Sequence, residues 1–358
     1  MGHIKQVVSV VVLALSASAC YQGQEDDLFD EIEAMRSLHD NALQFNGLTW
    51  NGLQWNGLQW NGLQWNGLQW NGIQWNGLQW NGLQWNGIQW NGIQWNSSRL
   101  DGSSIVVSRE VNGKKVEFRD DDLIGMEINL KVDVKDGQGK ISKADFVIRA
   151  TDIYTDGVQD DVYYYDLEIG LKGSNKWDPL CEGGVPAIPI SNYWNETNGK
   201  RIDDANVVTF ACTNGVLAHC VEWGYRPWAT SQECIEYKVG KKTKKFCWDV
   251  SLKDYHQACT RMARADYCGT GQAWTVPGTP IDIYDSLNPR IETPETDWPV
   301  EAEWNPNGAY CLDDIRQQGW KEEGKYPQCK WPLAREKSDC GSLKDHRALL
   351  VSKFEPVD

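Results

Sequence analysis

"NGLQWNGLQWNGLQWNGLQW", at residues 51–70, repeats one five-residue unit four times. Asn-Gly opens a unit at every fifth position from residue 46 to residue 91, and a Trp closes each unit. Imperfect copies on both sides extend the repeat to residues 41–105. A fixed period of this kind predicts a repeat architecture. The closing tryptophans are Trp50, Trp55, Trp60, Trp65, Trp70, Trp75, Trp80, Trp85, Trp90 and Trp95.

The period of five fits neither a helix, which needs about 3.6 residues, nor a strand, which needs about 2. Gly in every unit also opposes a continuous helix, at about 1 kcal/mol per Gly relative to Ala. Read from its Leu, the unit Leu-Gln-Trp-Asn-Gly resembles the pentapeptide-repeat pattern, whose members form a right-handed, four-sided β-helix. The resemblance implies a short β-solenoid over residues 41–105, with Gly at the corners of each coil.

The direction of the repeat tryptophans stays open. Inward Trp would fill the solenoid core, although it is bulky for a four-sided tube. Outward Trp would form an exposed aromatic ladder, and exposed apolar patches of that size usually mark binding sites. The ten repeat tryptophans would then be a binding platform. A disordered linker is a third interpretation, which the aromatic content disfavours.

The N-terminus, "MGHIKQVVSVVVLALSASAC", has the pattern of a secretory signal peptide over residues 1–19. Its apolar run is too short to span a membrane. The segment Ala17-Ser18-Ala19-Cys20 resembles a bacterial lipobox, with Ala17 in place of the usual Leu. The resemblance implies an exported protein with a lipid on Cys20, anchored in the outer membrane or at the cell surface. The alternative is ordinary cleavage after Ala19.

The cysteine count agrees with that assignment. Of 11 cysteines, Cys20 alone precedes residue 181. Assigning it to lipid leaves an even set, which predicts up to five disulfides in an exported protein, with the pairing open. The absence of a Cys-x-x-Cys pair argues against a metal site. The ten candidates are Cys181, Cys212, Cys220, Cys234, Cys247, Cys259, Cys268, Cys311, Cys329 and Cys340.

Composition divides the remaining chain into three parts. Residues 20–40 form an acidic tether or a short capping helix. Residues 106–215 alternate in the manner of an antiparallel sheet or sandwich, with a hairpin signal at Asn112-Gly113 and strands at 126–134, 145–154 and 161–171. A calcium-loop pattern at 134–145 lacks a carboxylate at its first position, which favours a hairpin turn. Residues 216–358 form the disulfide-rich part.

One amphipathic helix is predicted in that last part. Ser251 and Asp254 resemble a capping box at its start, and Gly269 is the predicted stop. Disulfides at Cys259 and Cys268 would pin it on both sides. Its apolar stripe is Tyr255, Ala258, Cys259, Met262 and Ala265. The predicted class is therefore mainly β: a short pentapeptide-type β-solenoid, then a disulfide-rich β-sheet or sandwich domain with at least one pinned α-helix.

The end of this helix carries a family resemblance. Ala265, Asp266, Tyr267, Cys268 and Gly269 resemble the signature of the ADYC domain family, found in exported proteins of myxobacteria and their relatives. "HQACTRMARADYCG" and "GYRPW" are similar to other blocks of that family, and the likeness covers about residues 105–345. It implies that residues 106–358 are an ADYC-like domain behind a lipoprotein signal and repeats. It implies no catalytic, cofactor-binding or metal-binding residue.

Catalysis and nucleic-acid binding are disfavoured by the residues themselves. A thiol hydrolase built on His256, Asp266 and a Cys needs a free thiol, which an evenly paired set does not leave. Asp266 is instead expected to contact Arg261 or Arg264. The net charge of −15 makes nucleic acid and anionic membrane surfaces poor partners. A basic run, Lys241, Lys242, Lys244 and Lys245, is expected at a solvated hairpin tip.

The predicted function is that of a non-catalytic cell-envelope lipoprotein without a cofactor. The lipid anchor attaches it to the membrane, and the solenoid is a rigid spacer or docking surface. The ADYC-like domain is presented to an unknown protein or glycan. One alternative is a glycan-binding adhesin that uses an exposed Trp ladder. Others are a secreted hydrolase and a peptide precursor, although no cleavage site separates the repeat units.

Overall fold

The structure is a computed structural model. It describes residues 83–84, 88–90, 93–94, 97–135, 141–195, 198–204, 207–276, 278–329, 340–343 and 347–355. The predicted signal peptide, Cys20, the acidic segment and most of the repeat lie outside the described residues. The mainly β class is confirmed, and none of the described helices is long and apolar enough to cross a membrane.

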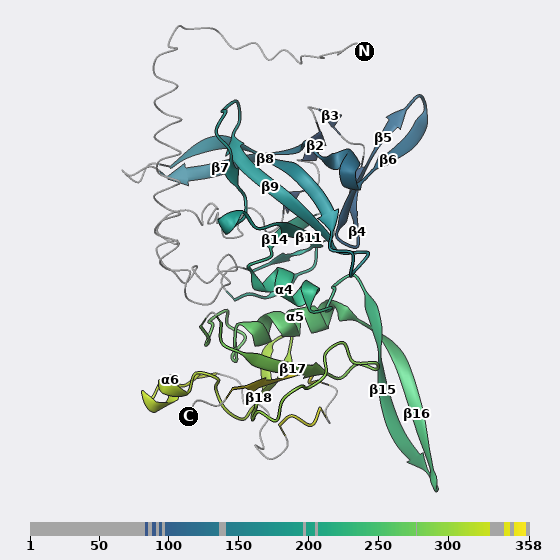
Figure 1. Ribbon diagram of the computed structural model, residues 1–358, viewed down its shortest axis with the longest axis vertical. Helices are drawn as coiled ribbons and strands as arrows, with labels where there is room; N and C mark the ends of the chain where they lie inside the picture. The colour runs from purple at the N-terminus through teal and green to yellow at the C-terminus, as the bar shows by residue number, and fades with distance from the viewer. Residues whose placement is uncertain are drawn as a thin grey trace.

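A nine-stranded sheet occupies the upper half of the molecule (Figure 1), and all of its pairings are antiparallel. The strands predicted at 126–134, 145–154 and 161–171 are confirmed as β7, β8 and β9. β7 and β8 pair as antiparallel neighbours up to Lys135 opposite Ile141, as a hairpin requires, and residues 136–140 between them lie outside the described residues. The order is β1 (Leu83–Gln84), β14 (Val207–Cys212), β11 (Ala187–Ser191), β9 (Tyr163–Leu171), β8 (Ile141–Thr155), β7 (Met126–Lys135), β2 (Ile88–Trp90) and β3 (Ile93–Gln94), with β10 (Asp178–Pro179) beside β9.

A three-stranded sheet packs on one face of that sheet. It consists of β4 (Ser97–Asp101), β5 (Ser104–Val111) and β6 (Lys114–Phe118), followed by the 3-10 helix η3 (Asp120–Leu123). The predicted hairpin is confirmed: Val111 pairs with Lys114, and the two turn residues have φ of 53° at Asn112 and 75° at Gly113. Positive φ at both central residues is what a type I′ hairpin turn requires.

The end of the repeat departs from the predicted stacking of coils. β2 pairs antiparallel with β3 of the next unit, and β1 and β2 join β14 and β7 of the large sheet. The two imperfect units at 96–105 contribute to the β4–β5 hairpin, so the solenoid prediction is wrong for them. Backbone hydrogen bonds of β1 and β2 are therefore satisfied by strands of the domain and not by a neighbouring coil of repeats. Over residues 41–82 the solenoid stays a prediction, because that chain lies outside the described residues.

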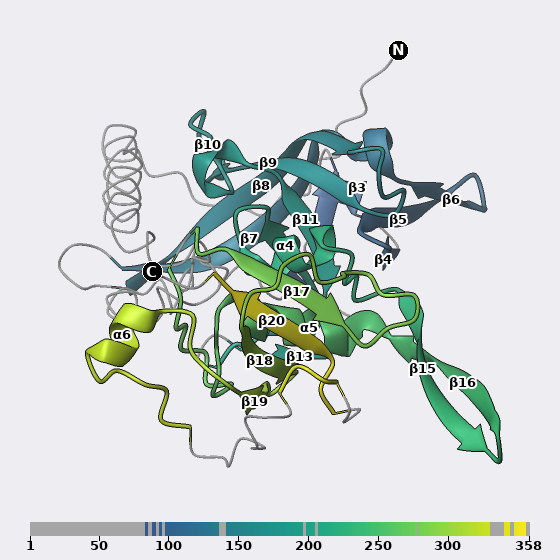
Figure 2. The ribbon, with the colours of Figure 1, turned by 60° about the horizontal axis from the view of Figure 1, so that its bottom comes forward.

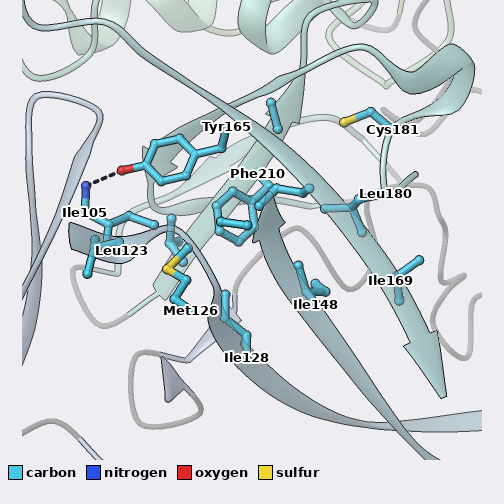
Figure 3. Packing of buried hydrophobic residues seen from close by; sticks show 14 of the residues in the cluster. Ile105, Leu123, Met126, Ile128, Ile148, Tyr165, Ile169, Leu180, Cys181 and Phe210 are labelled. Atoms are coloured by element: carbon cyan, nitrogen blue, oxygen red, sulfur yellow. Dashed lines mark hydrogen bonds between the residues drawn. The ribbon is translucent and has the colours of Figure 1, made fainter. Parts of the chain in front are cut away.

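The first hydrophobic core lies between these two sheets (Figure 3). It includes Ile105 from β5, Met126 from β7, and Phe210 from β14, all at most 2% exposed. Tyr165 crosses the core, and its hydroxyl oxygen accepts the Ile105 backbone N–H at 2.8 Å. This contact joins residues 60 positions apart. Burial raises the pKa of the Tyr165 phenol above its ordinary value.

Helix α4 (Val216–Glu222) covers the other face of the large sheet. Leu217 and Val221 pack on Ile188 and Ile190 of β11. Ala187, the neighbour of Ile188, belongs to the first core, because successive strand residues point to opposite faces. Both faces of this strand are therefore buried.

Helix α5 (Leu252–Ala263) lies below α4 and rests on a four-stranded sheet (Figures 1 and 2). The Cys220–Cys259 disulfide joins the two helices. The four strands are β17 (Ile281–Asp285), β20 (Leu350–Phe354), β18 (Val300–Asn305) and β19 (Gly308–Leu312), in that order. The helix pair therefore connects two sheets, each with its own core. Smaller elements are η4 (Glu182–Gly184), β12 (Tyr193–Trp194) with β13 (Arg201–Ile202), and α6 (Gln318–Glu322).

The predicted ends of α5 are partly confirmed. The Ser251 hydroxyl caps the start by accepting the Lys253 backbone N–H at 3.3 Å, while Asp254 pairs with Arg201 instead of completing a capping box. The predicted stop at Gly269 is wrong. The helix ends at Ala263, and Ala265, with φ of 50°, turns the chain out of the helix. Gly269 is a general helix-stop signal, but the residue with the left-handed conformation at this helix end is the fully buried Ala265.

Candidate functional site

Residues 265–269 join the end of α5 to the four-stranded sheet. The backbone carbonyl of Tyr267 accepts the Ala309 N–H of β19 at 2.9 Å. Ala265, Asp266 and Tyr267 are at most 1% exposed. This segment is the strongest candidate from the sequence, so the contacts of each side chain decide whether any group is available to a ligand.

The Asp266 carboxylate is fully enclosed by donors. One oxygen accepts the Thr270 N–H at 3.0 Å. The other accepts the Gly271 N–H at 2.8 Å and the Arg261 guanidinium at 2.5 Å. The predicted contact with Arg261 is confirmed, whereas Arg264 donates to the Gly271 carbonyl. A carboxylate with this many donors closes the loop after the helix and has little capacity left for a substrate.

Tyr267 leads into a buried ionic network. Its ring stacks on Trp304 with centroids 5.3 Å apart, and its hydroxyl donates to Glu301 at 2.5 Å. Glu301 also receives a bidentate pair of hydrogen bonds from Arg316, at 2.7 and 2.8 Å, and one from Ser352 at 2.6 Å. Burial, reinforced by the Glu301 charge, raises the pKa of the Tyr267 phenol well above its ordinary value. The phenol therefore stays protonated and acts as a fixed donor.

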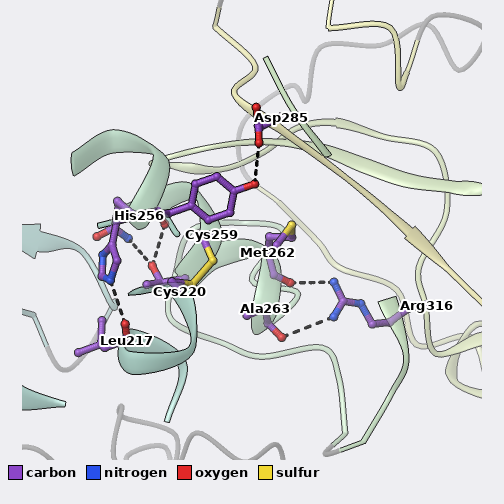
Figure 4. The surroundings of a disulfide bond; sticks show 11 residues. Leu217, Cys220, His256, Cys259, Met262, Ala263, Asp285 and Arg316 are labelled. Carbon is purple, nitrogen blue, oxygen red and sulfur yellow. Dashed lines mark hydrogen bonds between the residues drawn. A yellow bond between two sulfur atoms is a disulfide. The ribbon is translucent and has the colours of Figure 1, made fainter. Parts of the chain in front are cut away.

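Arg316 completes this network by reaching the helix end. Its guanidinium donates to the carbonyl of Met262 at 2.7 Å and to that of Ala263 at 3.5 Å (Figure 4). The last carbonyls of a helix have no partner within the helix and favour a cation. Glu301 and Arg316 carried no local sequence signal, because they lie 34 and 49 residues after Tyr267.

The last two residues of the segment, Cys268 and Gly269, fix it to neighbouring chain by a disulfide and by a close backbone approach. Cys268 forms a disulfide with Cys329. Gly269 has a φ of 63°, and a Cβ built there would lie 1.8 Å from the carbonyl oxygen of Asn307. Only Gly allows this approach of two backbones. All five residues of the segment therefore have structural contacts.

The proposed thiol nucleophile is not available. The ten cysteines after residue 180 form five disulfides, as the even count predicted. Within the described part of the chain, no three His, Cys, Asp or Glu side chains group in a way that could hold a metal ion. The pairs are Cys181–Cys212, Cys220–Cys259, Cys234–Cys247, Cys268–Cys329 and Cys311–Cys340.

His256 of α5 is fully buried against helix α4. Its Nε2–H donates to the Leu217 carbonyl at 3.0 Å (Figure 4), and its ring lies 5.7 Å from that of Trp194. Nδ1 has no hydrogen-bond partner. Burial lowers the pKa of His256 to about 4, so the ring is neutral at ordinary pH. It contributes to packing, and Asp266 does not contact it.

The block at 224–228 is also structural. The Tyr225 hydroxyl donates to Asp285 of β17 at 3.1 Å. Arg226 pairs with Asp161, whose other oxygen accepts the Trp228 indole N–H at 2.5 Å. These contacts attach the chain after α4 to β17 and to the turn that precedes β9.

Strands β15 (Thr230–Val239) and β16 (Lys242–Ser251) form a long hairpin that extends away from the body (Figures 1 and 2). The predicted position of the basic run at its turn is confirmed, since Val239 pairs with Lys242. Tyr237, Val239 and Phe246 are 44%, 50% and 56% exposed. Among the described residues, this hairpin offers an accessible candidate interface, in contrast to the buried segment 265–269. Apart from Trp90 in β2, the tryptophans of the predicted binding platform lie outside the described residues.

Comparison with known proteins found one family whose model includes the buried segment 265–269. The family model described as the ADYC domain matches residues 120–318, more than half of the chain. No curated protein and no solved structure matches the chain.

Proposed function

The chain belongs to the ADYC domain family, and on that premise we propose that it is a non-catalytic, lipid-anchored protein of the cell envelope. In this proposal the disulfide-stabilised domain is presented to a partner, and no reaction takes place at its signature segment. The observation that carries the proposal is the pairing of all ten cysteines after residue 180. Disulfides persist in oxidising compartments outside the cytosol, which agrees with the export signal in the sequence.

The contacts of residues 265–269 support a scaffolding role for the family signature. Asp266 and Tyr267 are engaged by protein donors and acceptors, and Cys268 is oxidised. A catalytic acid, base or nucleophile needs access to a substrate. These groups instead hold α5 against the four-stranded sheet, so the segment maintains the shape of the domain and recognition takes place elsewhere.

The N-terminal half of the proposal rests on sequence. Cys20 carries the lipid, and the repeat over residues 41–82 is a spacer between the anchor and the domain. The described repeat units pair with the edges of the large sheet, at β1 with β14 and at β2 with β7. The spacer would therefore be attached firmly to the domain, because backbone pairing fixes its end.

Fractionation of the full chain tests the anchor. Wild-type protein should sediment with membranes and carry added acyl mass on Cys20, and Cys20→Ser should be released into the detergent-free soluble fraction. Native protein should also show no thiol that reacts with maleimide after residue 180. A Cys20→Ser variant that stays on the membrane, together with wild type lacking acyl mass, would remove the anchor from the proposal. One reactive thiol in the native domain would restore the nucleophile hypothesis.

A further inference from the structure

The outer part of the β15–β16 hairpin, residues 235–246, is here termed the basic arm. The Cys234–Cys247 disulfide links the two strands where the arm leaves the body. Beyond it every residue from 236 to 246 is exposed. No other strand pairs with either edge in the described structure. A two-stranded ribbon is only marginally stable by itself, so the disulfide fixes an element that has no core of its own.

The two faces of the basic arm differ in composition. Directly opposed residues in an antiparallel pair point to the same face. On one face Ile235 lies opposite Phe246, Tyr237 opposite Lys244, and Val239 opposite Lys242. Phe246 also stacks on Trp248, with centroids 5.9 Å apart, which extends the apolar surface toward the body. This face is apolar and aromatic, with lysines at its outer end.

The opposite face is polar. It pairs Glu236 with Lys245 and Lys238 with Thr243. A solvated hairpin needs no aromatic side chains on either face, and a contiguous exposed apolar surface normally marks an interaction site. The difference between the faces therefore defines the side on which a partner would sit.

The charge of the basic arm identifies the chemistry of that partner. The arm has five lysines and one glutamate, giving a net charge of +4, on a chain whose total is −15. The five are Lys238, Lys241, Lys242, Lys244 and Lys245. Two copies joined by their apolar faces would bring four lysines, Lys242 and Lys244 from each copy, into one small interface, where like charges are unfavourable. The partner must be anionic and must also accept apolar side chains.

We propose that the basic arm lies on an anionic lipid surface, with its apolar face toward the acyl chains and its lysines on the phosphates. Aromatic and apolar side chains beside lysines suit the boundary between headgroups and hydrocarbon. Lysine stems can lie along the apolar layer while the ammonium groups reach the phosphates. The arm is then a second membrane contact beside the lipid on Cys20. This deepens the proposed envelope function and rests on it.

The acidic body does not prevent this contact. The arm holds five residues of β15, Ile235 to Val239, and extends about 16 Å at about 3.3 Å per residue. The Debye length at physiological ionic strength is about 8 Å. The negative charge of the body is therefore strongly screened at the outer lysines, which touch the lipid surface. The net charge of −15, from which anionic membrane surfaces are expected to be poor partners, is a sum over the whole chain and does not describe the separate charge of the arm.

Vesicle co-sedimentation of the full-length Cys20→Ser protein tests the basic arm without the acyl chain. Vesicles containing phosphatidylglycerol should bind the protein, and pure phosphatidylcholine vesicles should not. Lys242→Gln with Lys244→Gln should weaken binding at least about tenfold. The matched control is Lys114→Gln with Lys115→Gln, two exposed lysines of the β5–β6 hairpin. It should leave binding unchanged.

The apolar face needs its own pair of variants. Val239→Ser with Phe246→Ser should weaken binding at high salt, where the electrostatic part is screened. Val116→Ser with Ile124→Ser, which are 36% and 40% exposed elsewhere, should not. Unreactive thiols in each variant show that the disulfides have formed. Equal binding to neutral vesicles, or binding unaffected by the arm variants, overturns the proposal. So does arm-dependent sedimentation without vesicles, which indicates self-association. Loss of acyl mass on wild-type Cys20 would instead overturn only the anchor.

Discussion

Tyr267 donates its phenolic hydrogen to Glu301 at 2.5 Å, and both residues are at most 1% exposed. The contact joins the segment after α5 to the centre of the four-stranded sheet. Glu301 is an anion in a core, and it is tolerated because Tyr267, Arg316 and Ser352 all donate to it. A buried charge is costly once one partner is removed.

Tyr267→Phe should therefore lower the free energy of unfolding by about 1–3 kcal/mol, the usual cost of an unsatisfied buried polar group. The ring stack on Trp304 is kept, so the change isolates the hydroxyl. Urea unfolding measures it. Tyr237→Phe, at a 44% exposed position, is the matched control and should be close to neutral. Equal unfolding free energies for the two variants would show that the Glu301 contact contributes nothing.

Gly269→Ala should destabilise the domain far more than Gly113→Ala. Both glycines have positive φ, 63° and 75°, so both changes carry the similar cost of a left-handed Ala, about 1 kcal/mol. At Gly113 nothing lies within 4 Å of the added Cβ, whereas at Gly269 the Asn307 carbonyl oxygen lies 1.8 Å away. Relieving that clash should add at least about 1–3 kcal/mol.

Thermal or urea unfolding of the two Gly variants gives the comparison directly. Because the backbone conformations are alike, the difference between the variants reports the close approach of residues 269 and 307. A similar loss of stability in both would mean that the backbone near Asn307 moves freely aside.

Stability should fall in acid because of His256. The pKa of His256 is about 4 in the folded protein, whereas an ordinary histidine, as in the unfolded chain, has a pKa of 6.5. As the pH falls, the unfolded chain therefore takes up the proton first. The stability contributed by neutral His256 is present above pH 6.5 and is lost as the pH falls toward 4. The loss is on the order of 3 kcal/mol, since one pKa unit corresponds to about 1.4 kcal/mol.

Urea unfolding between pH 7 and pH 4 measures this effect, and His256→Gln should have a flatter profile than the wild type. His219 is a useful control, because burial also lowers its pKa but its side chain is only half-buried. His219→Gln should change the profile less. Parallel profiles for wild type and His256→Gln would exclude His256 as the cause of acid sensitivity.

The repeat can be tested through deamidation of its Asn-Gly pairs. Gly lets its backbone nitrogen attack the preceding side-chain amide, so Asn-Gly decays quickly in a flexible chain. In an ordered solenoid each Asn is held in one rotamer and its neighbours are hydrogen-bonded. The repeat in the full chain should therefore deamidate far more slowly than a synthetic four-unit peptide, which cannot stack. Mass spectrometry after days at mildly alkaline pH decides this, and equal rates would exclude an ordered solenoid.

Local features of this chain were predictable from sequence. Asn112-Gly113 predicted its hairpin because two adjacent residues that tolerate positive φ define the turn. The periodicity around Tyr255 located α5, and the even cysteine count predicted up to five disulfides. Each of these features depends on residues close in sequence or on the number of cysteines, so no long-range contact had to be known.

Which distant residues contact one another was decided by the tertiary structure alone. Nothing near Tyr267 indicated that Glu301 and Arg316 would neutralise one another beneath it. The helix stop was misplaced at Gly269, because the glycine is required by the passing backbone of Asn307 rather than by the helix. The last repeat units joined the large sheet because its open edges supplied hydrogen-bond partners. Sequence period and composition determine which local conformations are low in free energy. The pairing of side chains and strands depends on which distant groups the folded chain brings together.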